Sequence, residues 1–218
     1  MADNPNAEMS NESLRAAISE SVEEGMDIRE RVRDLTLQAI RSRRLDPDEV
    51  RQIMRAATEG VTLGLEGRGA DVRSALADAV KGMDEAFMKS AEAGRLALEE
   101  LTARARDFSE TELKQALANM KKMEEDFMAT LQQVAQTARP VVRTQMDDLL
   151  NHMRRSGTDT GMKVASTISE FAHRMAQAHI DSRIAGLEAA RELSARWVEM
   201  TSGFLAGLAE ALRRDDTK

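Results

Sequence analysis

The sequence contains neither cysteine nor tyrosine, and it has only one tryptophan and five phenylalanines among its 218 residues. Without cysteine the chain forms no disulfide bond and offers no thiolate to a metal, and nothing points to an oxidising compartment. With so few aromatic side chains, the core must be built from Leu, Ala, Met, Val and Ile, which suits narrow seams between helices. Only three prolines interrupt a composition that favours long helices over sheets. We therefore predict an all-α fold without a β-sheet.

Long apolar runs are also missing. No segment approaches the roughly 18 consecutive apolar residues that a membrane-spanning helix needs. Residues 1–9 are polar and acidic, without the apolar segment of a signal peptide, and we expect them to form a disordered tail. A cytoplasmic protein is expected. The net charge of -7 argues against general nucleic-acid binding, which depends on neutralising phosphates.

The most regular stretch runs from Ser109 to Arg155 and predicts one long helix. Its apolar residues recur at spacings of three, four and seven, which places them on one stripe: Leu113, Leu117, Met120, Phe127, Leu131 and Val134. Ser109 and Glu112 fit a capping box at its start, and Pro140 is expected to kink it. At about 1.5 Å per residue this helix spans roughly 70 Å, more than the diameter of about 44 Å of a compact chain of this length. An elongated bundle is therefore expected.

Other apolar stripes predict helices over residues 10–44, from 47 to the following glycines, 71–106 and 158–212. Pro47 suits the first position of a helix, and four glycines between Gly60 and Gly69 predict an elbow, because glycine weakens a helix interior. Together these patterns indicate four or five long helices in one bundle over residues 10–214, followed by a polar end at 215–218. Stripes of this length exceed what one chain covers, so we expect coiled-coil packing and a homo-oligomer.

Two segments about 40 residues apart resemble each other. Ala75-Leu76-Ala77 followed by Met83 to Met88 is similar to Ala116-Leu117-Ala118 followed by Met123 to Met128. Such an echo is typical of a helical-hairpin repeat, although amphipathic helices of low complexity also converge on it. It suggests that Phe87 and Phe127 occupy equivalent layers on neighbouring helices.

Residues that carry chemistry are scarce. The chain has three histidines, and one Glu-x-x-His motif, Glu170 to His173, which is half of what a di-iron bundle requires. Gly67-Arg68-Gly69 lacks the preceding strand and the Lys-Ser/Thr pair of a phosphate-binding loop. We therefore predict no catalytic residue, no cofactor and no metal, and hence a protein that is not an enzyme.

Two surfaces are candidates for binding. The first is a basic patch formed by Arg41, Arg43, Arg44 and Arg51, which suits an anionic lipid surface or an acidic partner, unless acids beside it make it an ordinary solvated face. The second is an apolar segment near the C-terminus, suited to adsorption or oligomer contact together with Phe87 and Phe127. Its residues are Trp197, Met200, Phe204, Leu205 and Leu208.

Fourteen methionines, many of them on the stripes, give either an ordinary core or an adaptable apolar face. With its Ala-rich amphipathic helices and stripes such as Leu113, Leu117 and Met120, this acidic, cysteine-free chain resembles bacterial phasins. The resemblance implies a non-enzymatic scaffold protein that coats polyhydroxyalkanoate granules, often as a coiled-coil oligomer. We expect adsorption to a granule or lipid surface and hence a granule-associated location. The alternative is a coiled-coil regulatory protein that binds another protein.

Overall fold

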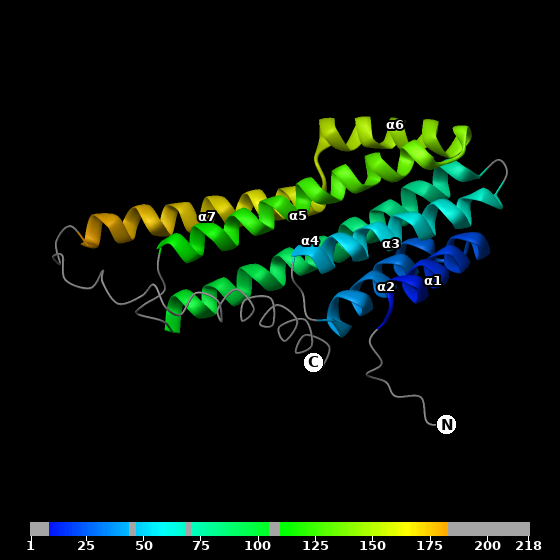
Figure 1. Cartoon of the computed structure of the whole chain (residues 1–218). Helices are drawn as coiled ribbons and strands as arrows, with labels where there is room; N and C mark the ends of the chain where they lie inside the picture. The colour runs from blue at the N-terminus through cyan, green and yellow to red at the C-terminus, as the bar shows by residue number, and fades with distance from the viewer. Residues whose placement is uncertain (1–8, 44–46, 69–70, 105–109, 183–218) are drawn as a thin grey trace, which may run out of the picture.

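A computed structural model describes residues 9–43, 47–68, 71–104 and 110–182. Within these ranges the secondary structure is helical and contains no strand, so the predicted all-α class is confirmed. The helices pack side by side into an elongated body (Figure 1). Their bounds are α1 Asn11–Glu24, α2 Ile28–Ser42, α3 Pro47–Glu66, α4 Val72–Arg104, α5 Glu110–Thr137, α6 Pro140–Ser156 and α7 Asp159–Ser182.

The structure therefore describes seven helices where the sequence indicated four or five, because two of the predicted helices are divided. The helix predicted over residues 10–44 ends at Gly25, whose φ of 78° lies in the left-handed region that glycine adopts without strain. Asp27 also has a positive φ, of 49°, and α2 then returns beside α1. Ser10 caps α1 by accepting a hydrogen bond from the amide of Ser13 at 3.1 Å.

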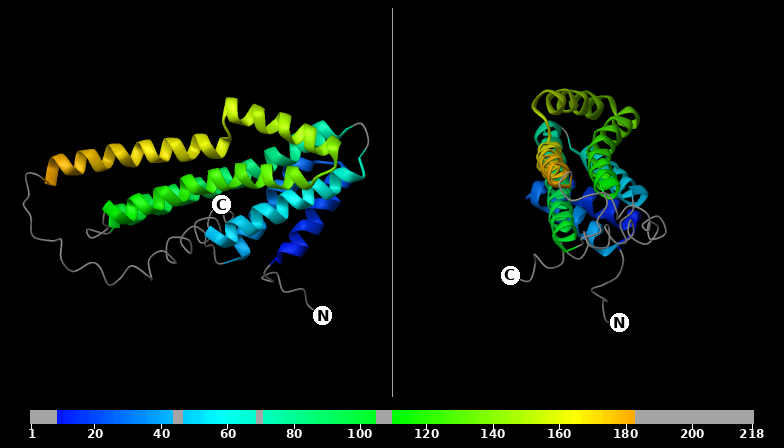
Figure 2. Two further views of the ribbon diagram at one scale, coloured as in Figure 1. Left: turned by 45° about the horizontal axis from the view of Figure 1, so that its top comes forward. Right: turned by 90° about the vertical axis from the view of Figure 1, so that its left-hand side faces the viewer.

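The second division lies at Pro140. The sequence predicted a kink there, but α5 ends at Thr137, and α6 begins at Pro140 and folds back along α5 (Figures 1 and 2). Arg139 is extended, with ψ of 150°, as expected for a residue that precedes proline. A single helix from Ser109 to Arg155 is therefore wrong; Ser109 itself lies outside the described residues.

The glycine-rich stretch, residues 60–69, is helical in its first part and leaves the helix in its second. Helix α3 starts at Pro47 as predicted and continues through Gly60 and Gly64 to Glu66, so the chain leaves the helix only at Gly67. Both interior glycines lie against α1. A β-carbon at Gly60 would meet the carbonyl oxygen of Arg15 at 2.6 Å. Gly60 and Gly64 thus have a packing role, because they allow two helices to approach, and the predicted break in the helix falls at Gly67.

The buried apolar residues form two clusters. The larger one, here called the main core, joins α1 to α6 and contains the rings of Phe87 and Phe127, whose centroids are 5.3 Å apart. The smaller one, here called the distal cluster, lies where α4, α5 and α7 run on together (Figure 1). It consists of Ala91, Leu98, Leu113, Ala116, Leu117, Met120, Val164 and Phe171. Helix α4, with 33 residues, contributes to both clusters.

We expect the substitution Gly64→Ala to destabilise the protein by about 1–3 kcal/mol, the usual cost of overpacking. A β-carbon there would lie 2.4 Å from the carbonyl oxygen of Ser19, a backbone atom that cannot move aside on its own. At an open helical position the same change would stabilise the protein by up to about 1 kcal/mol. The sign of the change in stability therefore tells whether Gly64 lies at a close helix crossing. Gly67→Ala is the control, because its β-carbon would have only an ordinary contact, 3.6 Å from Glu23 Oε1. Urea unfolding followed by circular dichroism measures both.

Candidate functional site

The predicted apolar contact residues divide into two groups. Trp197, Met200, Phe204, Leu205 and Leu208 lie outside the described residues. Phe87 and Phe127 are fully buried against each other in the main core. In the closed bundle these two rings are therefore interior residues, and they become a contact surface only if the helices separate.

The predicted basic patch is largely occupied by contacts within the chain. The guanidinium of Arg43 is buried, and it donates to the carbonyl of Met9 at 2.8 Å and to the side chain of Asn11 at 2.6 Å. Arg51 pairs with Asp48 and, across to α5, with Asp126 at 3.3 Å. The Nε atom of Arg41 is buried, and Arg44 lies outside the described residues. Of the two alternatives left open by the sequence, Arg43 and Arg51 fit the one in which groups of the same chain engage the arginines, namely the N-terminal segment and acids of α3 and α5.

A polar site lies between the two apolar clusters, where α6 gives way to α7. Its centre is Asp84 on α4, which is only 4% exposed. One carboxylate oxygen accepts a hydrogen bond from the amide of Asp159 at 2.8 Å, and the other accepts from the amide of Thr160 at 3.0 Å. The hydroxyl of Thr160 donates to the Asp84 carbonyl at 2.9 Å. We call these three residues the Asp84 clasp.

Two further contacts surround the clasp. Lys81, one turn earlier on α4, pairs with the carboxylate of Asp159 at 2.6 Å. On α5, burial raises the pKa of Glu124, and the negative charges of Glu125 and Asp84 act in the same direction, whereas a hydrogen bond from the Thr158 hydroxyl opposes them. Three helices thus meet at a partly buried group of charges, which is an uncommon arrangement in a bundle core.

Beyond the clasp, ion pairs join α7 to α4. Lys163 of α7 pairs with Glu92 of α4. Within α4, Arg95 pairs with Glu92 at 3.0 Å and with Glu99 at 2.8 Å. Arg174 reaches Glu99 at 2.8 Å. Hydrogen bonds from Arg95 and Lys163 outweigh partial burial and lower the pKa of Glu92. Because these pairs are partly solvated, each contributes little stability and more orientation.

Over residues 159–174, whose side chains the structure describes, α7 contributes few buried apolar residues. Its buried hydrophobic residues in the distal cluster are Val164 and Phe171, with Ile168 packed partly against them. Thr160 and Thr167 are fully buried on the same helix. In this part of α7, charged and hydroxyl groups therefore supply much of the contact with α4.

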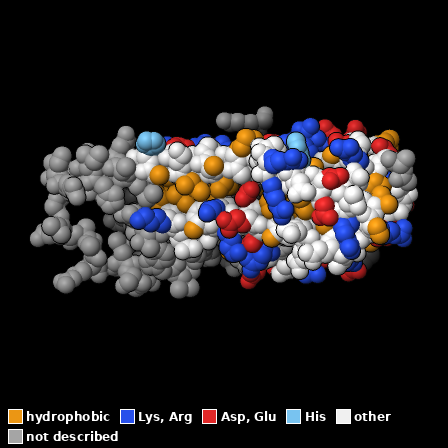
Figure 3. All heavy atoms as spheres, turned by 90° about the horizontal axis from the view of Figure 1, so that it is seen from above, with side chains coloured by type: hydrophobic (Ala, Val, Ile, Leu, Met, Phe, Trp, Pro, Cys, Tyr) orange, Lys and Arg blue, Asp and Glu red, His pale blue; other side chains and the backbone are white. Residues whose placement is uncertain are grey.

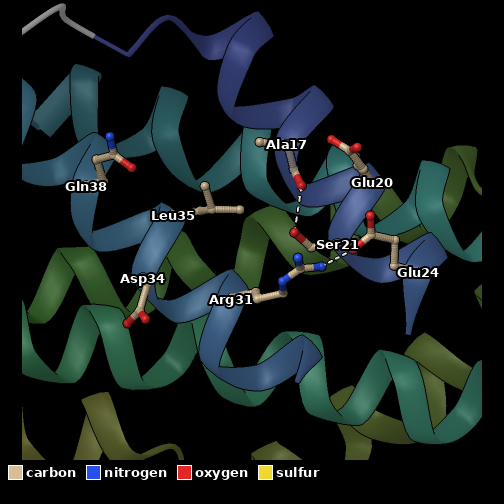
Figure 4. A pocket seen from close by; sticks show the side chains of 8 residues that line it. All are labelled: Ala17, Glu20, Ser21, Glu24, Arg31, Asp34, Leu35 and Gln38. Atoms are coloured by element: carbon tan, nitrogen blue, oxygen red, sulfur yellow. Dashed lines mark hydrogen bonds and ion pairs between the residues drawn. The ribbon is translucent and has the colours of Figure 1, made fainter. Parts of the chain in front are cut away.

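A groove of about 390 Å³ separates α1 from α2 (Figure 4). Glu20 and Glu24 line it from α1, and Arg31 and Asp34 from α2, with Leu35 as the main apolar contribution. Glu24 and Arg31 form an ion pair across it. Small-molecule sites are usually lined by apolar and aromatic side chains, so this acidic groove suits a polar or basic protein segment better.

Within the residues that the structure describes, no three His, Asp or Glu side chains are grouped to hold a metal ion. Glu170 of the Glu-x-x-His motif is engaged with Arg174, and His173 is exposed. Among the described helices, none is both long and apolar enough to span a membrane.

The model of a protein family described as "Family of unknown function (DUF6781)" matches residues 4–214. The chain belongs to this family. No curated protein and no solved structure matches the chain. The family covers all seven described helices and the clasp between them.

Sequence reasoning missed the clasp because its partners are 75 and 76 residues apart. One signal was present: Asp84 falls between Met83 and Phe87, on the apolar stripe of α4, where an unpaired carboxylate would be costly. A second was the pair Thr158 and Thr160 just after Gly157, which marks a helix start with hydroxyl groups.

We expect Glu124→Gln to raise the stability at pH 7 and to reduce its dependence on pH. The pKa of Glu124 is higher in the folded than in the unfolded protein, so the folded state holds the proton more tightly. Its contribution is present at low pH and is lost as the pH rises through the folded pKa. Wild type and variant should therefore agree near pH 4 and diverge toward pH 7, as measured by thermal unfolding. Glu30→Gln, at an exposed position on α2, is the control. Parallel curves for Glu124→Gln and wild type would contradict the expectation.

Proposed function

We propose that this protein is a non-catalytic surface-coating or scaffold protein, which adsorbs through amphipathic helices to a storage granule or a lipid surface. The proposal combines the resemblance to phasins with the two-cluster architecture. Adsorption of a helical bundle requires an apolar stripe that can leave its partners and meet the surface instead. The distal cluster supplies such a stripe.

The single observation that carries the proposal is the way in which the distal cluster is closed. Its residues on α4 and α5, such as Leu98, Leu113 and Leu117, are covered by α7. Over residues 159–174, the part of α7 whose side chains the structure describes, only Val164 and Phe171 are buried hydrophobic side chains. A fully buried side chain of this kind contributes about 1.5–3 kcal/mol. An extended apolar surface can replace that contribution, because it offers the stripe a larger apolar contact than α7 does.

The distribution of side chains on one face supports the same proposal. Hydrophobic side chains form a band over the half of the molecule that carries α7, whereas charged side chains are denser over the other half (Figure 3). Met120 and Met123 of α5 belong to or border the distal cluster. Methionine adapts to irregular partners, which suits a surface without a fixed shape.

Self-association is part of the proposal. Coiled-coil packing between copies of this chain would cover apolar stripe that adsorption leaves free, as in the oligomers implied by the resemblance. The predicted contact residues for this step are Trp197, Met200, Phe204, Leu205 and Leu208.

A second candidate function is binding of another protein by the closed bundle. The groove between α1 and α2 favours it, because three carboxylates line a shallow surface, of which Glu24 pairs with Arg31 and Asp34 with Arg33. Its natural occupant is a basic segment. Adsorption and partner binding differ physically, since the first separates α7 from α4 and α5 and the second leaves all seams closed.

We expect the purified protein to sediment with polyhydroxybutyrate particles. The same assay with vesicles that contain anionic lipid shows whether the protein prefers the polymer or a lipid surface. On the particles, amide hydrogen exchange should change over residues 113–124 and 161–174 but not over α1 to α3, because only the distal cluster opens. The emission of Trp197, the sole tryptophan, should shift to the blue.

Met162→Ser is the matched control, because this side chain is already exposed and is not part of the closed stripe. It should keep most of the binding. A protein that stays in the supernatant with unchanged Trp197 emission would overturn adsorption. Binding that is abolished by Met162→Ser and leaves the exchange of α7 unchanged would point to a contact of the closed bundle.

A further inference from the structure

We propose that the Asp84 clasp is a latch that holds α7 over the distal cluster and sets how readily that cluster is uncovered. This inference rests on the proposed function, because it names the contact that controls the adsorbing stripe. Its structural content is that α7 is a separately releasable helix, which is tested independently of adsorption.

The chemistry of the clasp is that of a helix cap supplied by another helix. The first amides of a helix have no acceptor within it, and the helix dipole makes that end favourable for a negative charge. Asp84 meets both needs of α7, with one carboxylate oxygen for the Asp159 amide and the other for the Thr160 amide. Hydrogen bonds to a charged group are stronger than neutral ones, and here they are shielded from water.

The position of the clasp suits a latch. It lies at the first residues of α7, directly after Gly157, where α6 ends with a φ of 81°. The main core, which includes Met146, Leu150 and Met153 of α6, stops before this point, and the distal cluster takes up α7 only from Val164. Motion of α7 about Gly157 therefore breaks the clasp and the distal contacts while leaving the main core intact.

Helix α7 keeps a local N-cap after release, although a helix without tertiary packing opens more often than a packed one. Thr158 precedes α7, and its hydroxyl oxygen accepts a hydrogen bond from the amide of Gly161 at 2.8 Å. This local cap belongs to the same segment and moves with it. Loss of Asp84 thus leaves two amides to water but does not remove the N-cap of α7.

The charges around Asp84 explain why the latch holds without being permanent. Lys81 of α4 neutralises Asp159, and Arg29 of α2 pairs with Glu85 beside the clasp. Against these, Glu124 brings a second partly buried carboxylate from α5, whose charge is disfavoured there. The positive and negative charges around the clasp therefore partly cancel, and the clasp orients α7 on α4.

The test compares Asp84→Asn with Asp78→Asn. Asparagine has nearly the shape of aspartate, but it offers one acceptor oxygen in place of two and no charge. Asp78 lies exposed on the same helix, so its variant makes the same charge change away from the clasp. We expect Asp84→Asn to speed amide exchange over residues 161–174 by about 10- to 100-fold, as expected for the loss of charged hydrogen bonds. Exchange in α1 to α3 should stay as in wild type, and binding to polyhydroxybutyrate particles should increase.

Thr160→Val supplies a milder break, since it removes only the hydrogen bond to the Asp84 carbonyl. It should shift exchange of α7 in the same direction by a smaller factor. If α7 exchanges in both variants as slowly as in Asp78→Asn, the latch is wrong, whatever the particles bind. Faster exchange across every helix of both variants would also overturn it, because Asp84 would then support the whole fold.

Release of α7 without any particle binding, in wild type and variants alike, would leave the latch standing and refute the proposed function. Faster exchange of α7 together with unchanged, substantial binding would show that adsorption does not pass through this helix. The latch would then lose its proposed control of the surface.

Discussion

The fold depends on the close approach of helix backbones, which a chain with so few aromatic side chains requires. Gly60 and Gly64 bring α3 against α1, and Gly82 brings α4 against α2, where an added β-carbon would lie 2.3 Å from the carbonyl oxygen of Arg29. Small residues at these crossings let Leu, Ile and Met on either side interdigitate without bulky rings. The N-terminal hairpin is thereby fixed to α3 and α4, and these two helices position everything that follows.

Beyond the main core, only α4, α5 and α7 among the described helices continue into the distal cluster. The clasp lies between the two clusters. A carboxylate that is 4% exposed costs stability unless it is well paired, so its retention in a seam calls for a role that an apolar residue would not fill. Well-paired charge gives orientation and register more than it gives stability. In this protein it fixes where α7 begins on α4, a position that Val164 and Phe171, the buried apolar residues among the described side chains of α7, define only loosely.

The sequence predicted the helical class, the start at Pro47 and most of the buried stripe, because periodicity reports directly which face meets a core. It failed where the chain turns while the stripe continues. Both helices around Gly25 face the same core, so buried apolar residues resume at Ile28 soon after Val22, and this near-continuous pattern conceals the turn. Pro140 was recognised, but whether proline kinks or ends a helix depends on what the following segment packs against. The clasp joins residues far apart in the chain, and no local pattern encodes such a meeting.

Helix α7 makes apolar contacts and polar contacts, and the difference between them bears on whether a small solute or an extended surface can displace it. An apolar surface can take over the contacts of Val164 and Phe171, since it needs no particular geometry. The same surface cannot supply a carboxylate to the amides of Asp159 and Thr160, which must then turn to water. In the proposed adsorption, the apolar contacts would favour exchange of α7 for a surface, and the clasp would add a cost that only a large contact offsets. A small apolar solute would gain too little area to release α7, whereas an extended interface would exceed that threshold.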